Sequence, residues 1–181
     1  MTTRLATQIA LAALSTATRE AFVNQLADIY EHSPWIPERA WTKRPFISIE
    51  TLWNQLQAVV AAASVAEKLS LIQAHPELAG HEAESATLTT ASSQEQHGAG
   101  LDQCSRDESL RLQALNQVYR QRFGFPVIVA VTGLSREEII NTIAVRQNNS
   151  WDSEFNTCLK EIGKIARIRL YARFSPADNT P

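Results

Sequence analysis

A histidine and a proline interrupt an apolar stretch, LIQAHPELAG, from Leu71 to Gly80. The apolar spacing before His75 is typical of a buried helix, and Pro76 prevents that helix from continuing. We therefore expect His75 at a helix C-terminus, where the negative end of the helix dipole favours the imidazolium form. Such a residue is a candidate acid or base near neutral pH, although it can also simply cap the last helix carbonyls.

A second polar segment, SSQEQ, covers residues 92 to 96. Ser92 and Glu95 have the Ser-x-x-Glu spacing of a helix capping box, in which each side chain binds a backbone N–H of the first turn. The same spacing occurs at Ser64/Glu67, Ser105/Glu108 and Ser135/Glu138. Gln96 adds an amide that both donates and accepts, and a polar cluster at a helix N-terminus can hold an anionic ligand. Capping and ligand binding both remain open for this segment, and one does not exclude the other.

The stretch FPVIVAV, from Phe125 to Val131, is the only strand-like part of the sequence. One strand cannot make a sheet, so we predict a buried extended segment between helices. Its backbone N–H and C=O groups then need other partners. A small heterocycle with ring N–H and C=O groups could supply them; the alternative is a core segment that meets only loops.

A metal site is the third chemistry to consider. His75, His81 and His97 lie in one third of the chain, together with Glu77, Glu82 and Glu84. Neither a Glu-x-x-His repeat nor a His-Glu-x-x-His motif is present. The sequence therefore predicts no metal site.

The apolar residues elsewhere have the period of α-helices. The patterns are Phe22, Leu26 and Ile29; Ile49, Leu52, Trp53, Leu56 and Val59; Leu115, Val118, Tyr119 and Arg122; and Phe155, Leu159, Ile162, Ala166 and Leu170. Gly124 is placed to end the helix before the extended segment. We predict an all-α, single-domain multi-helix bundle with one short extended apolar segment. The domain covers residues 1–174, and residues 175–181 form a disordered tail.

Composition narrows the possible partners. A net charge of −2 over 181 residues gives no broad basic surface, so we expect no nucleic acid and no anionic membrane as partners. No apolar run approaches the roughly 20 residues that span a bilayer, and the apolar core from Ile9 to Leu14 is short for a signal peptide. Cys104 and Cys158 form no paired motif, which favours a reducing compartment and a cytoplasmic protein.

Taken in order, three segments resemble the 2-oxo-4-hydroxy-4-carboxy-5-ureidoimidazoline (OHCU) decarboxylase family. They are AHPELAG, LTTASSQEQHGAGL and YRQRFGFPVIVAVTGLSREEII, and the stretches EHSPW and EIGKIARIRL also match the family's habits. The resemblance covers roughly residues 9 to 172. Its specificity lies in the order and spacing of the segments together.

The resemblance implies a cofactor-free, all-helical and usually dimeric decarboxylase that converts OHCU to (S)-allantoin in the last step from urate to allantoin. It assigns proton handling to His75 and a functional acid to Glu95, with Pro76 lining the pocket. The implied substrate-binding residues are Ser92, Ser93, Gln94, Glu95, Gln96, Phe125, Val127, Ile128, Val129, Ala130 and Val131. One position departs from the family: a second phenylalanine often follows its Phe-Pro pair, and here that residue is Val127.

Two other functions stay open. A non-enzymatic helical interaction domain would explain the helices and capping boxes but not the co-occurrence of three motifs. A metal-dependent hydrolase of the purine and ureide pathway would use His75, His81 and His97.

Overall fold

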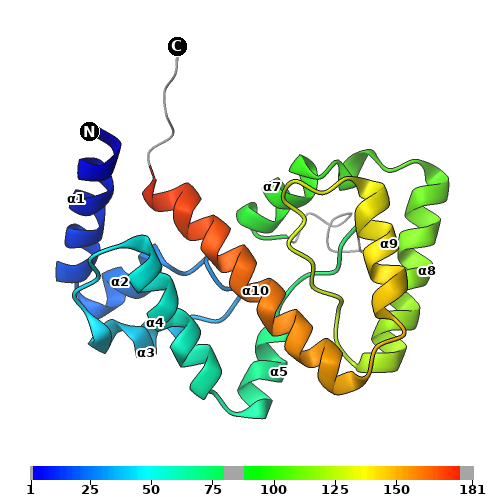
Figure 1. Ribbon diagram of the computed structural model, residues 1–181, viewed down its shortest axis with the longest axis horizontal. Coiled ribbons are helices and arrows are strands. Elements are labelled where there is room, and N and C mark those ends of the chain that lie inside the picture. The colour runs from blue at the N-terminus through cyan, green and yellow to red at the C-terminus, as the bar shows by residue number, and fades with distance from the viewer. Residues whose placement is uncertain (1, 80–87, 176–181) are drawn as a thin grey trace. The chain divides into compact units, whose positions relative to one another are not determined.

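The computed structural model describes residues 2–79 and 88–175, and its secondary structure is helical (Figure 1). The helices are α1 (Thr2–Thr16), α2 (Arg19–Gln25), α3 (Trp35–Ala40), α4 (Ile49–Ala62), α5 (Val65–Gln73), α7 (Thr90–Gly98), α8 (Arg106–Phe123), α9 (Arg136–Arg146) and α10 (Trp151–Phe174), with 3-10 turns η1 (Trp41–Lys43) and η2 (Leu101–Gln103). No β-strand occurs in the described residues. The all-α prediction is confirmed.

The chain divides into two compact units. The first unit combines residues 1–68 with residues 163–181, and the second unit is the continuous stretch 69–162. Helices α5 and α10 each contribute to both units. A single domain over residues 1–174 stays a prediction, and residues 176–181 of the predicted tail lie outside the described part.

Three of the four predicted capping boxes begin helices. Ser64, Ser105 and Ser135 each accept from the N–H of the glutamate three residues later, and that glutamate accepts from the serine N–H. The first backbone N–H groups of a helix have no partner within the helix, and these reciprocal bonds satisfy some of them. They therefore fix where α5, α8 and α9 begin. The fourth box, at Ser92, does not form and is described below.

The first unit packs α2, α3 and α4 around a common apolar core. Phe22, Leu26, Leu52 and Leu56 are buried in it, as the helical period predicted. Ile36 is buried with them. In this unit, Trp53 Nε1 donates to the carbonyl oxygen of Gly163 in α10 at 2.9 Å. The second half of α10 thereby closes this core, and the predicted long final helix is confirmed.

In the second unit, α8 packs against α9, and the chain between them runs without regular structure (Figure 1). The buried face of α8 is Leu112, Asn116, Tyr119 and Phe123. The predicted face was wrong in phase, because Val118 and Arg122 are exposed. Because the buried face includes the polar residue Asn116, the apolar pattern of the sequence did not reveal it. Gly124 ends α8 with φ +79°, a left-handed conformation that glycine adopts without steric cost, so the predicted stop is confirmed.

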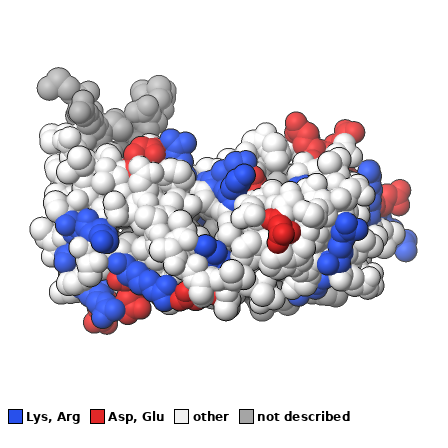
Figure 2. Space-filling view, turned by 60° about the horizontal axis from the view of Figure 1, so that its bottom comes forward, with Lys and Arg blue, Asp and Glu red and all other residues white. Residues whose placement is uncertain are grey.

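The surface carries charges of both signs. Figure 2 shows basic and acidic side chains interspersed over the face drawn, with no broad region of one sign among the described residues. No helix within the described ranges is long and apolar enough to cross a membrane.

Candidate functional site

His75 lies just past the end of α5 and is 5% exposed. Its ring Nδ1 is 2.8 Å from the carbonyl oxygen of Leu71, one turn earlier. A carbonyl can only accept, so Nδ1 carries a proton and Nε2 is the nitrogen whose protonation can change. The structure thus supports both readings of this histidine, because the bond that caps a helix carbonyl also fixes the ring.

The loop after Pro76 is tied down from two helices. Gln96 of α7 accepts from the Ala79 N–H at 2.9 Å and donates to the Glu77 carbonyl at 3.2 Å. Asn116 of α8, absent from the sequence-based site, donates to the Leu78 carbonyl at 2.8 Å. Ala79 has φ +49°, a conformation that costs a residue with a Cβ about 1–2 kcal/mol. These bonds hold the loop in that conformation and bring the first two motifs together.

The second motif is shifted relative to its predicted role. Thr89, not Ser92, is the N-cap of α7, and its hydroxyl accepts from the Ser92 N–H at 3.3 Å. The capping box predicted for Ser92 and Glu95 is therefore wrong, since both residues lie inside the helix. Ser92 and Gln96 are buried and Glu95 is half-buried. Their spacing of three and four residues puts them on one helix face.

The other two residues of this segment, Ser93 and Gln94, are exposed. They lie on the opposite side of α7 from the buried face. Within this motif, the structure therefore gathers Ser92, Glu95 and Gln96 and not their two neighbours.

The third motif is the predicted extended segment. Residues 126–131 have no helix or strand assignment, and Val127, Ile128, Val129 and Val131 are buried. Gln73, two residues before His75, donates to the carbonyl of Gly124 at 3.1 Å. This bond ties the end of α5 to the residue just before the third motif, so all three motifs are linked within the second unit.

Phe125 has a different environment from the rest of that segment. Its ring is fully buried, with ring centroids 6.0 Å from Phe123, 6.3 Å from Tyr119 and 5.9 Å from Trp151. Its side chain is thus part of an aromatic cluster of the core.

A buried polar cluster that the sequence did not reveal lies beneath the third motif. We call Tyr119, Arg146, Glu154 and Cys158 the Arg146 cluster. Arg146 Nη2 is 2.8 Å from Glu154 Oε2, and the Tyr119 hydroxyl donates to the same carboxylate. Glu154 is 0% exposed. Arg146 and Glu154 are eight residues apart across a turn, and no helical period predicts their pairing.

The pKa values in this cluster follow from burial and pairing. Burial acts to raise the pKa of the Glu154 carboxyl, but hydrogen bonds from Arg146, Tyr119 and Asn149 outweigh it and hold that pKa below its usual value. Burial raises the pKa of the Tyr119 hydroxyl and of the Cys158 thiol. The cluster therefore holds an ionised carboxylate and guanidinium beside a neutral phenol and thiol near neutral pH.

The residues of the metal hypothesis do not come together where they can be described. His97 is exposed and its Nδ1 lies 2.6 Å from Asp102 Oδ2, whereas His75 is buried. Glu77 pairs with Arg120 at 2.6 Å. His81, Glu82 and Glu84 lie outside the described residues. Within residues 2–79 and 88–175, no group of three His, Cys, Asp or Glu side chains is placed to hold a metal ion.

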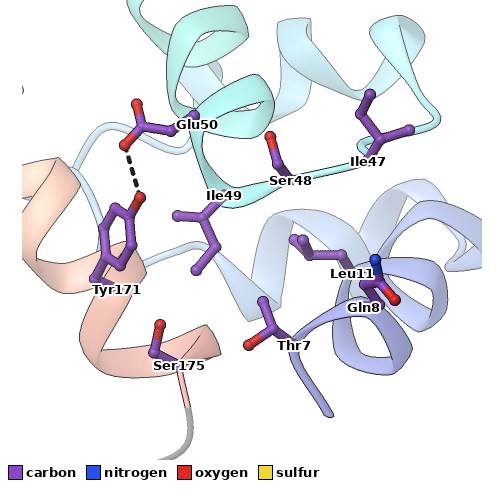
Figure 3. Close-up of a pocket in the computed structure, with 9 residues that line it drawn as sticks. All are labelled: Thr7, Gln8, Leu11, Ile47, Ser48, Ile49, Glu50, Tyr171 and Ser175. Carbon is purple, nitrogen blue, oxygen red and sulfur yellow. Dashed lines mark hydrogen bonds between the residues drawn. The ribbon is translucent and has the colours of Figure 1, made fainter. Parts of the chain in front are cut away.

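A cavity of about 290 Å³ lies in the first unit (Figure 3). Leu11, Ile47 and Ile49 give it apolar walls, and Glu50 accepts from the Tyr171 hydroxyl at its rim at 2.7 Å. None of the motif residues lines it. It is therefore not the site that the motifs predict.

Comparison with known proteins decides the family. The family model described as OHCU decarboxylase matches residues 15–171. The chain belongs to the OHCU decarboxylase family. This confirms the resemblance seen in the sequence, including its near-complete coverage of the chain.

Relatives of this OHCU decarboxylase family member differ in length. It is 41% identical over 156 residues to 2-oxo-4-hydroxy-4-carboxy-5-ureidoimidazoline decarboxylase of Haloferax volcanii, covering 86% of this chain and 90% of that protein. It is 39% identical to the uric acid degradation bifunctional protein of Bacillus sp. (strain TB-90), covering 92% of this chain but 32% of that protein.

A solved structure agrees with the fold. A crystal structure of (S)-allantoin synthase superposes with a TM-score of 0.71 at 27% identity, covering 90% of this chain and 53% of that chain. This family member thus spans about a third of the bifunctional protein and about half of the allantoin synthase chain.

Proposed function

We propose that this protein decarboxylates OHCU to (S)-allantoin, the last step from urate to allantoin. The observation that carries the proposal is the linkage of three motifs by Gln73 and Gln96 within one unit of a chain that matches the family over residues 15–171. A helical interaction domain without catalysis would not need a strained loop bonded from two sides.

The chemistry follows from the substrate. One ring carbon bears a hydroxyl and the carboxylate, and the adjacent ring carbon is an imine that carries the ureido arm. When the bond to the carboxylate breaks, carbon dioxide leaves, the electron pair forms a double bond between the two ring carbons, and the imine nitrogen takes up a proton. The hydroxyl then loses its proton to become a carbonyl, and the ureido carbon gains one. Because the substrate supplies its own electron sink, we propose a reaction without a cofactor or metal.

The proposed roles use the groups that the loop and α7 present. His75 handles the hydroxyl proton through Nε2, since Nδ1 is committed to Leu71. Glu95 is the functional acid, and its carboxyl group accepts hydrogen bonds from ring or ureido N–H groups. Pro76 and the anchored loop hold the imidazole against the pocket wall, which preserves the reacting geometry. Ser92 and Gln96, with the segment from Val127 to Val131, are the proposed substrate-binding residues; Ser93 and Gln94 lie on the other side of α7, and the Phe125 ring lies in the core.

The first experiment adds synthetic OHCU to the purified protein with a chelator present. We expect faster decay of OHCU and an optically active product, because a closed chiral pocket protonates one face. Activity that disappears on exhaustive chelation and returns with a metal would favour the hydrolase alternative. Unchanged OHCU decay would favour a non-enzymatic domain.

The second experiment is His75→Asn, which keeps a polar group of similar size but cannot exchange a proton near neutral pH. We expect kcat to fall about 10²–10⁴-fold with the fold retained. His97→Asn is the matched control, because that histidine is exposed and paired with Asp102. A folded His75→Asn protein with near-normal turnover would remove this histidine from the mechanism.

The third experiment is Glu95→Gln, with the exposed Glu137→Gln as control. Because Glu95 does not cap α7, its replacement removes no capping bond, and a fall in activity reports on the site itself. Equal activity of the two variants would contradict a functional role for Glu95.

Beyond the reaction, we propose a cytoplasmic homodimer that binds a small molecule, with neither nucleic acid nor membrane as partner. The absence of a paired cysteine motif supports the cytoplasmic location, and the small net charge supports the absence of nucleic acid and membrane partners. The family resemblance supports the dimer. Sedimentation analysis of the purified protein tests the dimer directly.

A further inference from the structure

One face of α8 holds the loop that follows His75. Asn116 Nδ2 donates to the Leu78 carbonyl at 2.8 Å, and one helical turn later Arg120 Nε donates to Glu77 Oε1 at 2.6 Å. Residues four apart lie on the same face of a helix, so both side chains reach the loop from one direction. All five residues belong to the second unit.

The same helix also holds the chain on the other side of His75. Gly124 follows Arg120 by four residues, and its carbonyl accepts from Gln73 at 3.1 Å. Contacts from three successive turns of α8 therefore fix the chain before and after His75. The imidazole Nδ1 lies 2.8 Å from the Leu71 carbonyl of α5. Hence α8 sets the position of this backbone, and α5 sets the orientation of the ring.

The Asn116 amide is only half satisfied. The residue is 5% exposed, and within residues 2–79 and 88–175 its Oδ1 accepts no hydrogen bond. Turning the amide over would place Oδ1 against the Leu78 carbonyl, where two acceptors repel, so Nδ2 is the atom that meets this carbonyl. A buried acceptor without a partner lowers stability, and the rest of the buried face consists of Leu112, Tyr119 and Phe123. The bond to Leu78 is what Asn116 contributes and an apolar residue could not.

The contact between Arg120 and Glu77 is not explained by stability either. The two side chains are 54% and 24% exposed, and water screens an ion pair in that setting, so it adds little to the free energy of unfolding. Glu77 lies two residues after His75, on the far side of Pro76, where the chain leaves the helix. A bond from Arg120 at this residue therefore fixes the direction in which the loop departs from His75.

We propose that Asn116 and Arg120 are positioning residues for His75, and that α8 fixes the place of its imidazole through them. Neither side chain needs to touch the substrate in this role. The proposal rests on the proposed function, because that function gives His75 the proton transfer. A displacement of about 1 Å at a reacting group can reduce the rate about 10²-fold, so loss of the Asn116 bond should lower kcat far more than it raises KM.

Asn116→Leu removes the donor while keeping a side chain of similar size. We expect kcat for OHCU to fall about 10²-fold, with KM changed much less. Gln147→Leu is the matched control, because Gln147 also donates to a carbonyl of the second unit, that of Leu115 in α8, at 2.8 Å. A folded Asn116→Leu protein with the same kcat as Gln147→Leu would overturn the proposal.

Asn116→Asp makes the same bond depend on pH, and it decides the question if Asn116→Leu does not fold. The protonated side chain donates to the Leu78 carbonyl as the amide does, whereas the ionised one repels it. Burial raises the pKa of the introduced carboxyl group. The other titratable groups of these contacts, His75, Glu77 and Arg120, are shared with the wild type, so the ratio of the two kcat values cancels their titration. That ratio should fall as the pH rises from about 5 to about 8, and a constant ratio would overturn the proposal.

Arg120→Gln tests the second contact. We expect kcat to fall about threefold, the fold-change that an exposed ion pair can account for, and Glu77→Gln to have the same effect. The double variant should lose no more than either single variant, because all three remove one bond. Arg122→Gln is the control, since Arg122 lies on the same helix and donates to the Asn149 carbonyl at 3.1 Å. Losses that multiply in the double variant, or equal kcat in Arg120→Gln and Arg122→Gln, would overturn the role of Arg120.

Chemical modification tests the position of His75 without turnover. Diethyl pyrocarbonate modifies accessible imidazole groups, and His75 is 5% exposed whereas His97 lies on the surface. Peptide mass mapping should find His75 modified slowly in the wild type and in Gln147→Leu but faster in Asn116→Leu, with His97 as the internal reference. An unchanged rate at His75 in folded Asn116→Leu would overturn the proposal. If the wild type leaves OHCU decay unaccelerated, the proposed function fails, while the modification rates still report whether Asn116 holds His75.

Discussion

Replacement of Gln96 by leucine should separate stability from catalysis. The side chain is 6% exposed and makes two hydrogen bonds to the loop after His75, to the Ala79 N–H and the Glu77 carbonyl. Each bond contributes about 1 kcal/mol net. If the loop kept its conformation, Gln96→Leu would therefore cost about 2 kcal/mol or somewhat more.

The loop has a reason not to keep its conformation. Ala79 is left-handed at φ +49°, which costs about 1–2 kcal/mol. Once the bonds from Gln96 are lost, relaxation recovers much of that cost and lets water reach both backbone groups. We therefore expect a net loss of only about 1 kcal/mol in the free energy of unfolding.

The same relaxation should be costly for catalysis. A displacement of about 1 Å at a reacting group can reduce the rate about 10²-fold, and His75 is four residues before Ala79. We expect Gln96→Leu to lower kcat by about that factor. Urea unfolding followed by circular dichroism gives the stability, and OHCU decay gives kcat.

Gln147→Leu is the control. Gln147 is half-buried and donates one bond to the Leu115 carbonyl at 2.8 Å, with no left-handed residue involved. Its stability loss should also be about 1 kcal/mol, while kcat stays near the wild-type value. Equal kcat in the two variants, or a loss above about 3 kcal/mol for Gln96→Leu, would refute the relaxation argument.

Three further expectations concern stability. Gly124→Ala should lower the free energy of unfolding by about 1–2 kcal/mol in urea titrations, because φ +79° is left-handed; an unchanged midpoint would contradict this. Ala79→Gly should change it by less than about 1 kcal/mol, because relief of the left-handed cost offsets the extra entropy of glycine in the unfolded chain. Hydrogen bonds from Arg39 and then Ser64 lower the pKa of Glu67 to about 2, so its contribution is present above its usual value of 4.5 and is lost as the pH falls toward 2. The stability difference between the wild type and Glu67→Gln, measured by thermal unfolding, should shrink over that range, and a constant difference would contradict it.

The start of α7 shows why sequence reasoning placed some helices correctly and not this one. At α8 and α9 the helix begins at Ser105 and Ser135, although Asp102 and Thr132 lie three residues earlier and could also serve as caps. Before Ser92, however, Thr89 offers a second cap three residues upstream, and the structure uses it. The local sequence alone does not decide between two possible N-cap residues three positions apart, because the outcome depends on which face of the helix becomes buried.

The third motif could be predicted because its signals are local. Gly124 ends α8, Pro126 is fixed in φ, and no other segment of the sequence could pair with it as a strand. The Arg146 cluster could not be predicted. Its members come from α8, α9 and α10 and meet only after packing, so no spacing in the sequence reveals them.

The way the two units are cut from the chain has a consequence for the order of folding. The unit with the three motifs is one continuous stretch, whereas the other must join residues 1–68 to residues 163–181. The bond from Trp53 to Gly163 closes a loop of 110 residues, and the bond from Arg39 to Glu67 one of 28. The longer loop is about two doublings of the shorter one, which adds about 1.2 kcal/mol to the entropic cost of closing it.

On the ribosome the disadvantage is larger, because the second half of α10 is synthesised only after the whole motif-bearing unit. We therefore expect the motif-bearing unit to form its core before the second half of α10 is available to pack in the first unit. Pulse-labelled hydrogen exchange during refolding should protect amides of α8 and α9 before those of α4. Earlier protection of α4 would show that α2, α3 and α4 form a stable core without the second half of α10.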